Sequence, residues 1–150
     1  MPLPKHINLG PLLSVMKPDK DVCGRRLHSG FKPIMAVGIM DYLKYCDVRL
    51  AGKDVVILGR NEKALVDMLL EANATVTICH EHSRHSAHIY HCDLIINAMK
   101  FFDCKPIEVP IIDMVNGTVN WENKDMVRSI EVLELLGLVN NLNKLGKPNL

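Results

Sequence analysis

The stretch KDVVILGRNEKALVDMLLEANATVTICH, residues 53–80, decides the fold of this chain. Its aliphatic run at 54–58 predicts a strand that is covered on both faces. Gly59 then ends the run where the backbone must turn sharply. A helix is predicted over 62–72, and a second strand over 74–78. A strand, a glycine turn, a helix and a parallel strand form one right-handed crossover.

The helix of this crossover is amphipathic and can lie back on the first strand. Its apolar side chains recur on one side at helical spacing: Ala64, Leu65, Met68 and Leu69. In such units, the turn after the first strand places backbone N–H groups and a helix N-terminus against a ligand phosphate. The stretch is therefore typical of a nucleotide-binding fold.

The rest of the chain extends the crossover into an α/β fold, a Rossmann-like parallel sheet with flanking helices. Two further buried strands and a short last strand are predicted at 93–98, 109–114 and 118–120, with a tight turn at 116–117. Helices are predicted at 7–16, 34–46 and 124–138. The polar tail, 140–150, is expected to fray.

Composition limits the classes of function. The chain has 150 residues, the size of one domain, and a net charge of +1, so no basic excess indicates nucleic acid. No apolar stretch approaches the length of a membrane span, and no signal or transit peptide pattern is present. The five cysteines form no CxxC pair, which favours free thiols. We expect a cytoplasmic protein, with the mitochondrial matrix as an open alternative.

Several blocks of sequence resemble one enzyme family. GKDVVILGR, NATVTICH, CDLIINA and PIIDM are similar to successive strands of the bifunctional methylenetetrahydrofolate dehydrogenase/cyclohydrolase family (FolD type). PLPKHIN, KPDKDVCG and FKPIMAVGIMDYL resemble segments that precede those strands in the family. The likeness runs in order over residues 2–114, and several blocks together are more specific than one glycine pattern.

The resemblance implies a domain plan and a cofactor. Members combine a catalytic domain that holds the folate with a Rossmann-type domain that holds NADP or NAD. The plan implies a remnant of the folate-binding catalytic domain at 1–30, a Rossmann-like NAD(P)-binding domain at 31–123, and a closing helix and tail at 124–150. It places the chain in folate one-carbon metabolism.

The family's catalytic groups are not found in this sequence. They are a Tyr-x-x-x-Lys pair, a Gln before Pro-Leu-Pro and the second Asp of Asp-Val-Asp-Gly. In this sequence Cys23 stands at that aspartate position, and Met1 directly precedes Pro-Leu-Pro. The nearest Tyr-x-x-x-Lys spacing is Tyr45 to Arg49. Arginine stays protonated and cannot shuttle a proton near neutral pH. We therefore assign no catalytic residue and expect a catalytically inactive relative.

The cofactor turn also departs from the family pattern, G-R-S-x-x-V-G-x-P. Gly59 and Arg60 keep its first part and Asn61 replaces the serine. The second glycine and the proline are missing, which weakens the phosphate seat. Ala98-Met99-Lys100 replaces Ala-x-Gly after the third strand and adds bulk near the expected nicotinamide. The resemblance implies weak binding of NADP or NAD through five residues: Gly59, Arg60, Asn61, His80 and Glu81.

Three of these residues have alternative roles. Arg60 either meets an adenosine 2′-phosphate or is a solvated loop arginine. Asn61 either contacts ribose or phosphate, or caps the following helix. His80 either lies at the cofactor edge or has a structural role.

The stretch from Cys79 to Cys92 contains five histidines: His80, His82, His85, His88 and His91. A helix could bring two of them onto one side as metal ligands, but the pattern matches no established zinc spacing. We expect an exposed loop and no bound metal, with a metal-binding loop as a lesser hypothesis.

Two functions from different classes remain. The first is a folate-enzyme relative that retains weak dinucleotide binding. The second is a non-catalytic interaction or regulatory protein, whose exposed cleft face binds a partner protein or a second copy of the chain.

Overall fold

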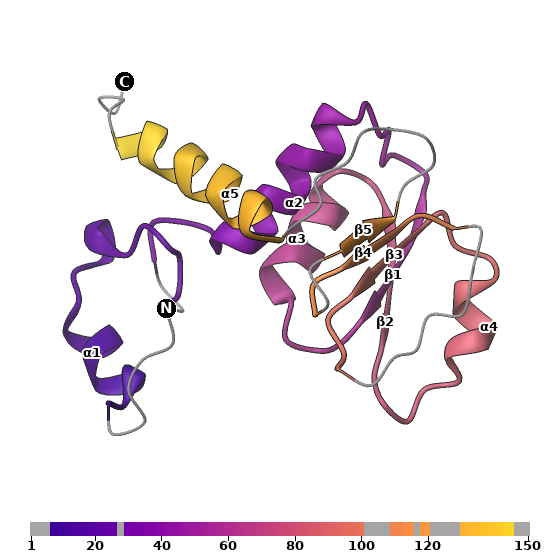
Figure 1. Cartoon of the computed structure of the whole chain (residues 1–150), viewed down its shortest axis with the longest axis horizontal. Helices are drawn as coiled ribbons and strands as arrows, with labels where there is room; N and C mark the ends of the chain where they lie inside the picture. The colour runs from indigo at the N-terminus through magenta and orange to yellow at the C-terminus, as the bar shows by residue number, and fades with distance from the viewer. Residues whose placement is uncertain (1–6, 27–28, 101–108, 116–117, 121–129, 146–150) are drawn as a thin grey trace.

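The computed structural model describes residues 7–26, 29–100, 109–115, 118–120 and 130–145. Figure 1 shows a central sheet with helices around it, and an N-terminal segment carrying α1 at the end of the molecule away from α4. The predicted tight turn at 116–117 lies outside the described residues.

The sheet has five strands in the order β2-β1-β3-β4-β5. They are β1 (Asp54–Leu58), β2 (Thr75–Cys79), β3 (Leu94–Asn97), β4 (Ile111–Asp113) and β5 (Thr118–Asn120). The first four are parallel, and β5 runs antiparallel to β4. The predicted fold class, a Rossmann-like parallel sheet with flanking helices, is confirmed.

The helices are α1 (Leu9–Val15), a 3-10 turn η1 (Pro18–Lys20), α2 (Ile34–Tyr45), α3 (Lys63–Glu71), α4 (His85–Ile89) and α5 (Ile130–Leu145). No helix in the described part of the chain is long and apolar enough to cross a membrane.

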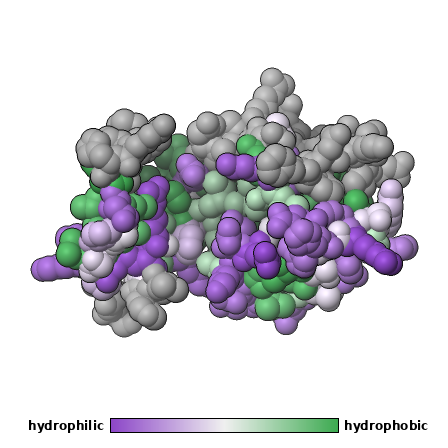
Figure 2. Space-filling model, turned by 90° about the horizontal axis from the view of Figure 1, so that it is seen from below, coloured by the Kyte–Doolittle hydropathy of each residue, from purple (hydrophilic) through white to green (hydrophobic). Residues whose placement is uncertain are grey.

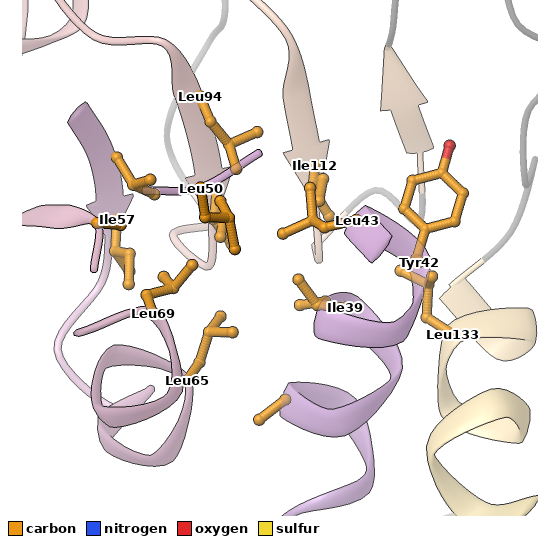
Figure 3. Close-up of a cluster of buried hydrophobic side chains, with 14 of the residues drawn as sticks. Ile39, Tyr42, Leu43, Leu50, Ile57, Leu65, Leu69, Leu94, Ile112 and Leu133 are labelled. Atoms are coloured by element: carbon orange, nitrogen blue, oxygen red, sulfur yellow. The ribbon is translucent and has the colours of Figure 1, made fainter. Parts of the chain in front are cut away.

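Both faces of β1 are covered, as its continuous aliphatic run predicts. Val55 and Ile57 belong to the larger core with residues of α2, α3 and α5. Figure 3 shows Ile57 of the sheet on the side of α3 and Ile112 on the side of α2. Leu133 lies where α5 meets α2, and the ring of Tyr42 points from α2 toward the sheet. Val56 and Leu58 face the other way and pack with Ile89 of α4. The alternation follows from the period of two along a strand.

Two glycines bring the backbones of α2 and α5 together. A Cβ atom at Gly38 would overlap the carbonyl oxygen of Leu133, and one at Gly137 would overlap that of Ile34 and lie 3.0 Å from the nitrogen of Gly38. The helices therefore cross at a distance that only glycine permits.

The predicted end of the last helix is wrong. We expected the helix to end at Leu138 and the tail from Asn140 to fray, but α5 continues to Leu145. Asn141 is fully buried there, and its Nδ2 atom donates to the carbonyl oxygens of Val22 and Lys32 at 2.8 and 3.0 Å. These contacts hold the second half of α5 against the N-terminal segment, which the polar sequence alone did not indicate.

One surface ion pair predicts an acid-sensitive contribution to stability. Lys53 Nζ donates to Asp93 Oδ1 at 2.7 Å, and the backbone nitrogen of Asp54 donates to Oδ2 at 2.9 Å. Chiefly the Lys53 hydrogen bond, and then the Asp54 one, lower the pKa of Asp93. A carboxyl group with a lowered folded-state pKa contributes stability above its unfolded pKa of about 3.9, and loses it as pH falls through the folded value.

Asp93→Asn is therefore expected to lower the free energy of unfolding at pH 7 by at most about 1 kcal/mol, because the pair is exposed to solvent. The loss should shrink as the pH falls below about 4. Urea unfolding at several pH values measures both effects, and Asp67→Asn, at an exposed position of α3, is the control. A constant difference between wild type and Asp93→Asn at all pH values would contradict this assignment.

Candidate functional site

The loops at the carboxyl ends of β1, β2 and β3 line one pocket of about 350 Å³. Its lining residues are Gly59, Arg60, Asn61, His80, Glu81, Ala98, Met99 and Lys100. The structure thus brings together all five residues that the sequence predicted for cofactor binding. They meet because the three strands are parallel neighbours in register, with Leu58 opposite both Cys79 and Asn97.

Gly59 forms the junction of the three strand ends. Its nitrogen donates to the carbonyl oxygen of Cys79 at 2.8 Å. The nitrogen of Ala98 donates to the carbonyl oxygen of Leu58 at 2.7 Å. Its φ is +128°, and an added Cβ would lie 3.1 Å from the Cβ of Ala98. A side chain here would be strained and would push into the neighbouring strand end, so glycine is required.

Arg60 and Asn61 are exposed in the loop that leads to α3. The residue that precedes the first turn of α3 is Glu62, and no side chain forms a cap hydrogen bond there. The alternative role of Asn61 as the helix cap is therefore wrong. The first-turn N–H groups have no capping side chain, and the positive end of the helix dipole favours an anion.

A second cavity of about 180 Å³ adjoins the pocket and shares Gly59 and Arg60 with it. Glu62, Lys63 and Ile78 are among its other lining residues. Burial raises the pKa of Glu62, which favours its neutral form relative to an exposed glutamate. Arg60 is the charged residue that lines both cavities.

A hydrogen-bonded turn presents Glu81 at the end of β2. The carbonyl oxygen of His80 accepts from the nitrogen of Ser83 at 2.8 Å and contacts His85 Nε2 at 2.8 Å. The nitrogen of His80 donates to Ser83 Oγ at 3.0 Å. His80 therefore lines the pocket and also holds this turn. Glu81 Oε1 lies 3.4 Å from His82 Nε2, and both side chains are exposed.

The part of the pocket that follows β3 depends on Asn97, a residue that was not among the predicted site residues. Asn97 is fully buried, and its Oδ1 accepts from the nitrogen of Met99 at 2.9 Å. Its carbonyl oxygen accepts from the nitrogen of Met114 at 2.8 Å. The side chain thus fixes the chain direction before Lys100. An amide inside the apolar run LIIN was the available signal, because buried polar groups need a partner.

The histidine-rich stretch is not an open loop throughout. Residues 85–89 form α4, and Ile89 packs against the second face of the sheet. Within the described residues, no group of three or more histidine, cysteine or acidic side chains is arranged to hold a metal ion.

Two cysteines, Cys79 at the end of β2 beside the site and Cys92 before β3 at the opposite edge of the sheet, are poor nucleophiles. Burial raises the pKa of the Cys79 thiol, against a smaller opposing effect of the Ser83 hydrogen bond, and burial also raises that of Cys92. The thiolate is the reactive form of cysteine, so these environments disfavour covalent chemistry.

Residues 33–103 match the family model described as "Tetrahydrofolate dehydrogenase/cyclohydrolase, NAD(P)-binding domain". The chain is similar to the bifunctional protein FolD of Macrococcus caseolyticus, with 37% identity over 157 residues, covering 93% of this chain and 56% of that protein. FolD of Staphylococcus epidermidis is 36% identical over 112 residues, covering 66% of this chain and 39% of that protein. The chain thus spans about half the length of these relatives or less.

Solved structures have the same architecture. The bifunctional enzyme FolD from Campylobacter jejuni superposes with a TM-score of 0.75 at 26% identity, over 97% of this chain and 64% of that one. A 5,10-methylenetetrahydrofolate dehydrogenase from the silkworm Bombyx mori also gives 0.75, at 21% identity over 97% of this chain and 64% of that one. The Trypanosoma brucei FolD, solved with NADP and an inhibitor, superposes with a TM-score of 0.68 at 22% identity, over 97% of this chain and 64% of that one.

Proposed function

Since the chain belongs to the tetrahydrofolate dehydrogenase/cyclohydrolase family through its NAD(P)-binding domain, we propose that it binds NAD or NADP weakly and performs no folate chemistry by the family mechanism. One observation carries the binding proposal: three neighbouring strand ends place the five expected contact residues around one pocket. Ligands of open parallel sheets bind at the carboxyl ends of the strands.

The residues present fit a dinucleotide. Gly59 has no side chain to keep the backbone from a pyrophosphate, and the first turn of α3 begins close by without a side-chain cap. Arg60 supplies a guanidinium that suits phosphate oxygens, and Lys100, after β3, supplies a second cation in the pocket lining. When bound, a nicotinamide dinucleotide supplies a hydride acceptor or donor.

Two features of the pocket weaken the binding. The loop before α3 lacks the second glycine that would bring the helix start against the pyrophosphate, and its Arg60 and Asn61 side chains are exposed. Met99 and Lys100 add side chains at the β3 end, where the family pattern ends in glycine. Cofactor held by exposed side chains gains less from each ionic contact, because water screens the charges.

The proposed lack of folate chemistry is supported by Cys23, which stands where the family has an aspartate and has no carboxylate with which to position a substrate. The nearest spacing to a Tyr-x-x-x-Lys pair in this sequence, Tyr45 to Arg49, lies before β1 and offers an arginine. A general acid or base needs a pKa near the working pH, which arginine does not have.

Arg60→Ala is expected to weaken dinucleotide binding about tenfold, because one charge-assisted phosphate contact is lost. Calorimetric titration of the full chain measures the affinity. Arg49→Ala removes an equally exposed arginine before β1, at the opposite end of that strand, and should leave binding unchanged. Equal affinities for the two variants would remove Arg60 from the site.

A second function, that of a non-catalytic interaction protein, is favoured by exposed apolar side chains on α5. They are Val132, Leu135, Leu136, Val139, Leu142 and Leu145. On the face shown in Figure 2, hydrophobic residues also gather at the end of the molecule that carries α1, where Leu12 and Val15 are exposed. A stable dimer in sedimentation velocity, together with no dinucleotide binding, would favour this second function.

A further inference from the structure

We infer that a second copy of this chain packs on the outward face of α5, so that two α5 helices form a short parallel coiled coil. The inference rests on the second proposed function, that of an interaction protein, and names its partner and its surface. It does not depend on dinucleotide binding, because none of the described lining residues of the pocket at the ends of β1, β2 and β3 belongs to α5.

α5 has two apolar faces, and the described part of the chain covers one of them. Leu133 is fully buried, and a Cβ at Gly137 would overlap the backbone of Ile34 in α2. The outward seam consists of four side chains that are 41–58% exposed: Val132, Leu135, Val139 and Leu142. Leu135 and Val139 each lie two residues from Gly137, about 200° around the helix, so the seam points away from α2. A helix that is apolar on opposite sides is typical of one buried between two neighbours.

The spacing of the outward seam indicates a helix of the same kind as its partner. Its four residues are separated by three, four and three positions, which is the a/d spacing of a coiled coil. Val132 and Val139 occupy the a positions, and Leu135 and Leu142 the d positions. β-branched residues at a with leucine at d favour a parallel pair of helices. A two-fold pair uses the same patch on both partners, which one self-complementary seam provides.

A groove beside the seam can receive a side chain of the second helix. It has a volume of about 420 Å³, and four residues of α5 line it: Leu136, Val139, Asn140 and Asn143. Their spacing, i, i+3, i+4 and i+7, is that of the four-residue hole in coiled-coil packing. In a parallel pair the g position of one helix faces the e position of the other, so Leu138 of one copy enters this groove beside Asn143 of the other. Asp41 and Lys144 also line the groove, and their opposite charges give it no net charge with which to repel a second copy.

The interface is short, so the expected dimer is weak. The seam spans two heptads, and its side chains are already about half covered by their own chain. A standard stable interface buries about 800 Å² on each partner, of which such a seam supplies only a part. Because α5 is already folded against α2, pairing does not have to nucleate a helix. We expect a dissociation constant of about 10–100 µM.

Sedimentation equilibrium of the full chain between about 5 µM and 500 µM tests the pairing, because this range brackets the expected constant. Wild type is expected to change from monomer to dimer. Leu135→Lys puts a charge into the seam and should weaken association about tenfold or more. Glu134→Lys is the matched control, since it introduces the same side chain at an exposed position outside the seam and should dimerise like wild type. Both positions are exposed, and circular dichroism spectra confirm that the variants are folded.

Crosslinking tests the parallel arrangement. Two copies of residue 139 face each other in a parallel pair, so oxidation of Val139→Cys should give a disulfide-linked dimer. In an antiparallel pair residue 139 of one copy would instead face residue 135 of the other. Glu134→Cys carries the same native cysteines and an added thiol outside the seam, and it should crosslink no more than wild type.

The outcomes separate this inference from both proposed functions. A monomer at every concentration would overturn the inference. A dimer that Leu135→Lys leaves intact would also overturn it, although self-association through another surface would stand. Equal crosslinking of Val139→Cys and Glu134→Cys would contradict the parallel pair. Titration of the same samples with NAD reports on the pocket separately, so failure of the seam and failure of dinucleotide binding are distinguishable.

Discussion

Gly137→Ala is expected to lower the free energy of unfolding by about 3 kcal/mol, the upper part of the range for overpacking a close contact. The added methyl would overlap the carbonyl oxygen of Ile34 and lie 3.0 Å from the Gly38 nitrogen. These are backbone atoms of α2, so no rotamer change can relieve the clash. The helices must separate, and Leu133 would then leave its fully buried place in the core.

The direction of the stability change distinguishes the backbone clash from an effect of helix propensity. In an ordinary helix interior, replacing glycine by alanine stabilises by about 1 kcal/mol, so a loss of stability cannot come from helix propensity. Urea unfolding followed by circular dichroism measures the change. Gly30→Ala is the control, because a Cβ there meets no atom within 4 Å and the φ is not positive. A Gly137→Ala protein as stable as wild type would show that α2 and α5 are farther apart.

Asn141→Asp is expected to cost about 3 kcal/mol or more at pH 7, although the two side chains have the same shape. The amide of Asn141 donates to the carbonyl oxygens of Val22 and Lys32 and is fully buried. An aspartate would lose both donors and bring a negative charge against two carbonyl oxygens. The N-terminal segment would then lose its hydrogen bonds to α5.

Asn143→Asp provides the matched control, since it makes the same chemical change two residues away at an exposed position of α5. It should change stability by less than about 0.5 kcal/mol. Hydrogen exchange can follow the backbone around Val22 and Lys32, which should exchange faster in Asn141→Asp alone. Equal stability of the two variants would contradict the buried hydrogen bonds.

The crossover at the centre of the fold could be predicted because its signals are local. The run before Gly59 is apolar at every position after Asp54, and β1 is indeed covered on both faces. The stripe on α3 follows the helical period, and Leu65 and Leu69 are fully buried. Such patterns reflect burial of a whole face, which sequence periodicity records directly.

The α2–α5 pair could not be predicted in the same way. The contact between Gly38 and Leu133 joins residues far apart in the chain, and a glycine in a helix gives no local sign of its partner. The tail was expected to fray because Asn140 and Asn141 are polar. Buried hydrogen bonds from Asn141 to a distant segment override that polarity.

The site was predictable to the extent that parallel strands fix it. Once β1, β2 and β3 are neighbours, the residues after each strand must lie at one edge, which is why Arg60 and Glu81 line the same pocket. The role of Asn61 was not predictable, because the first residue of α3 decides which side chain can cap it. Asn97 was missed because its contact with Met99 depends on how the chain leaves β3.

The central claim is that the pocket at the ends of β1, β2 and β3 binds a dinucleotide. Isothermal titration calorimetry of the full chain with NAD tests it most directly. The account predicts a saturable, one-to-one binding curve with a dissociation constant between about 10 µM and 1 mM, weakened in Arg60→Ala. No measurable heat with NAD or NADP at millimolar concentration, confirmed by an orthogonal thermal-shift assay, would contradict it.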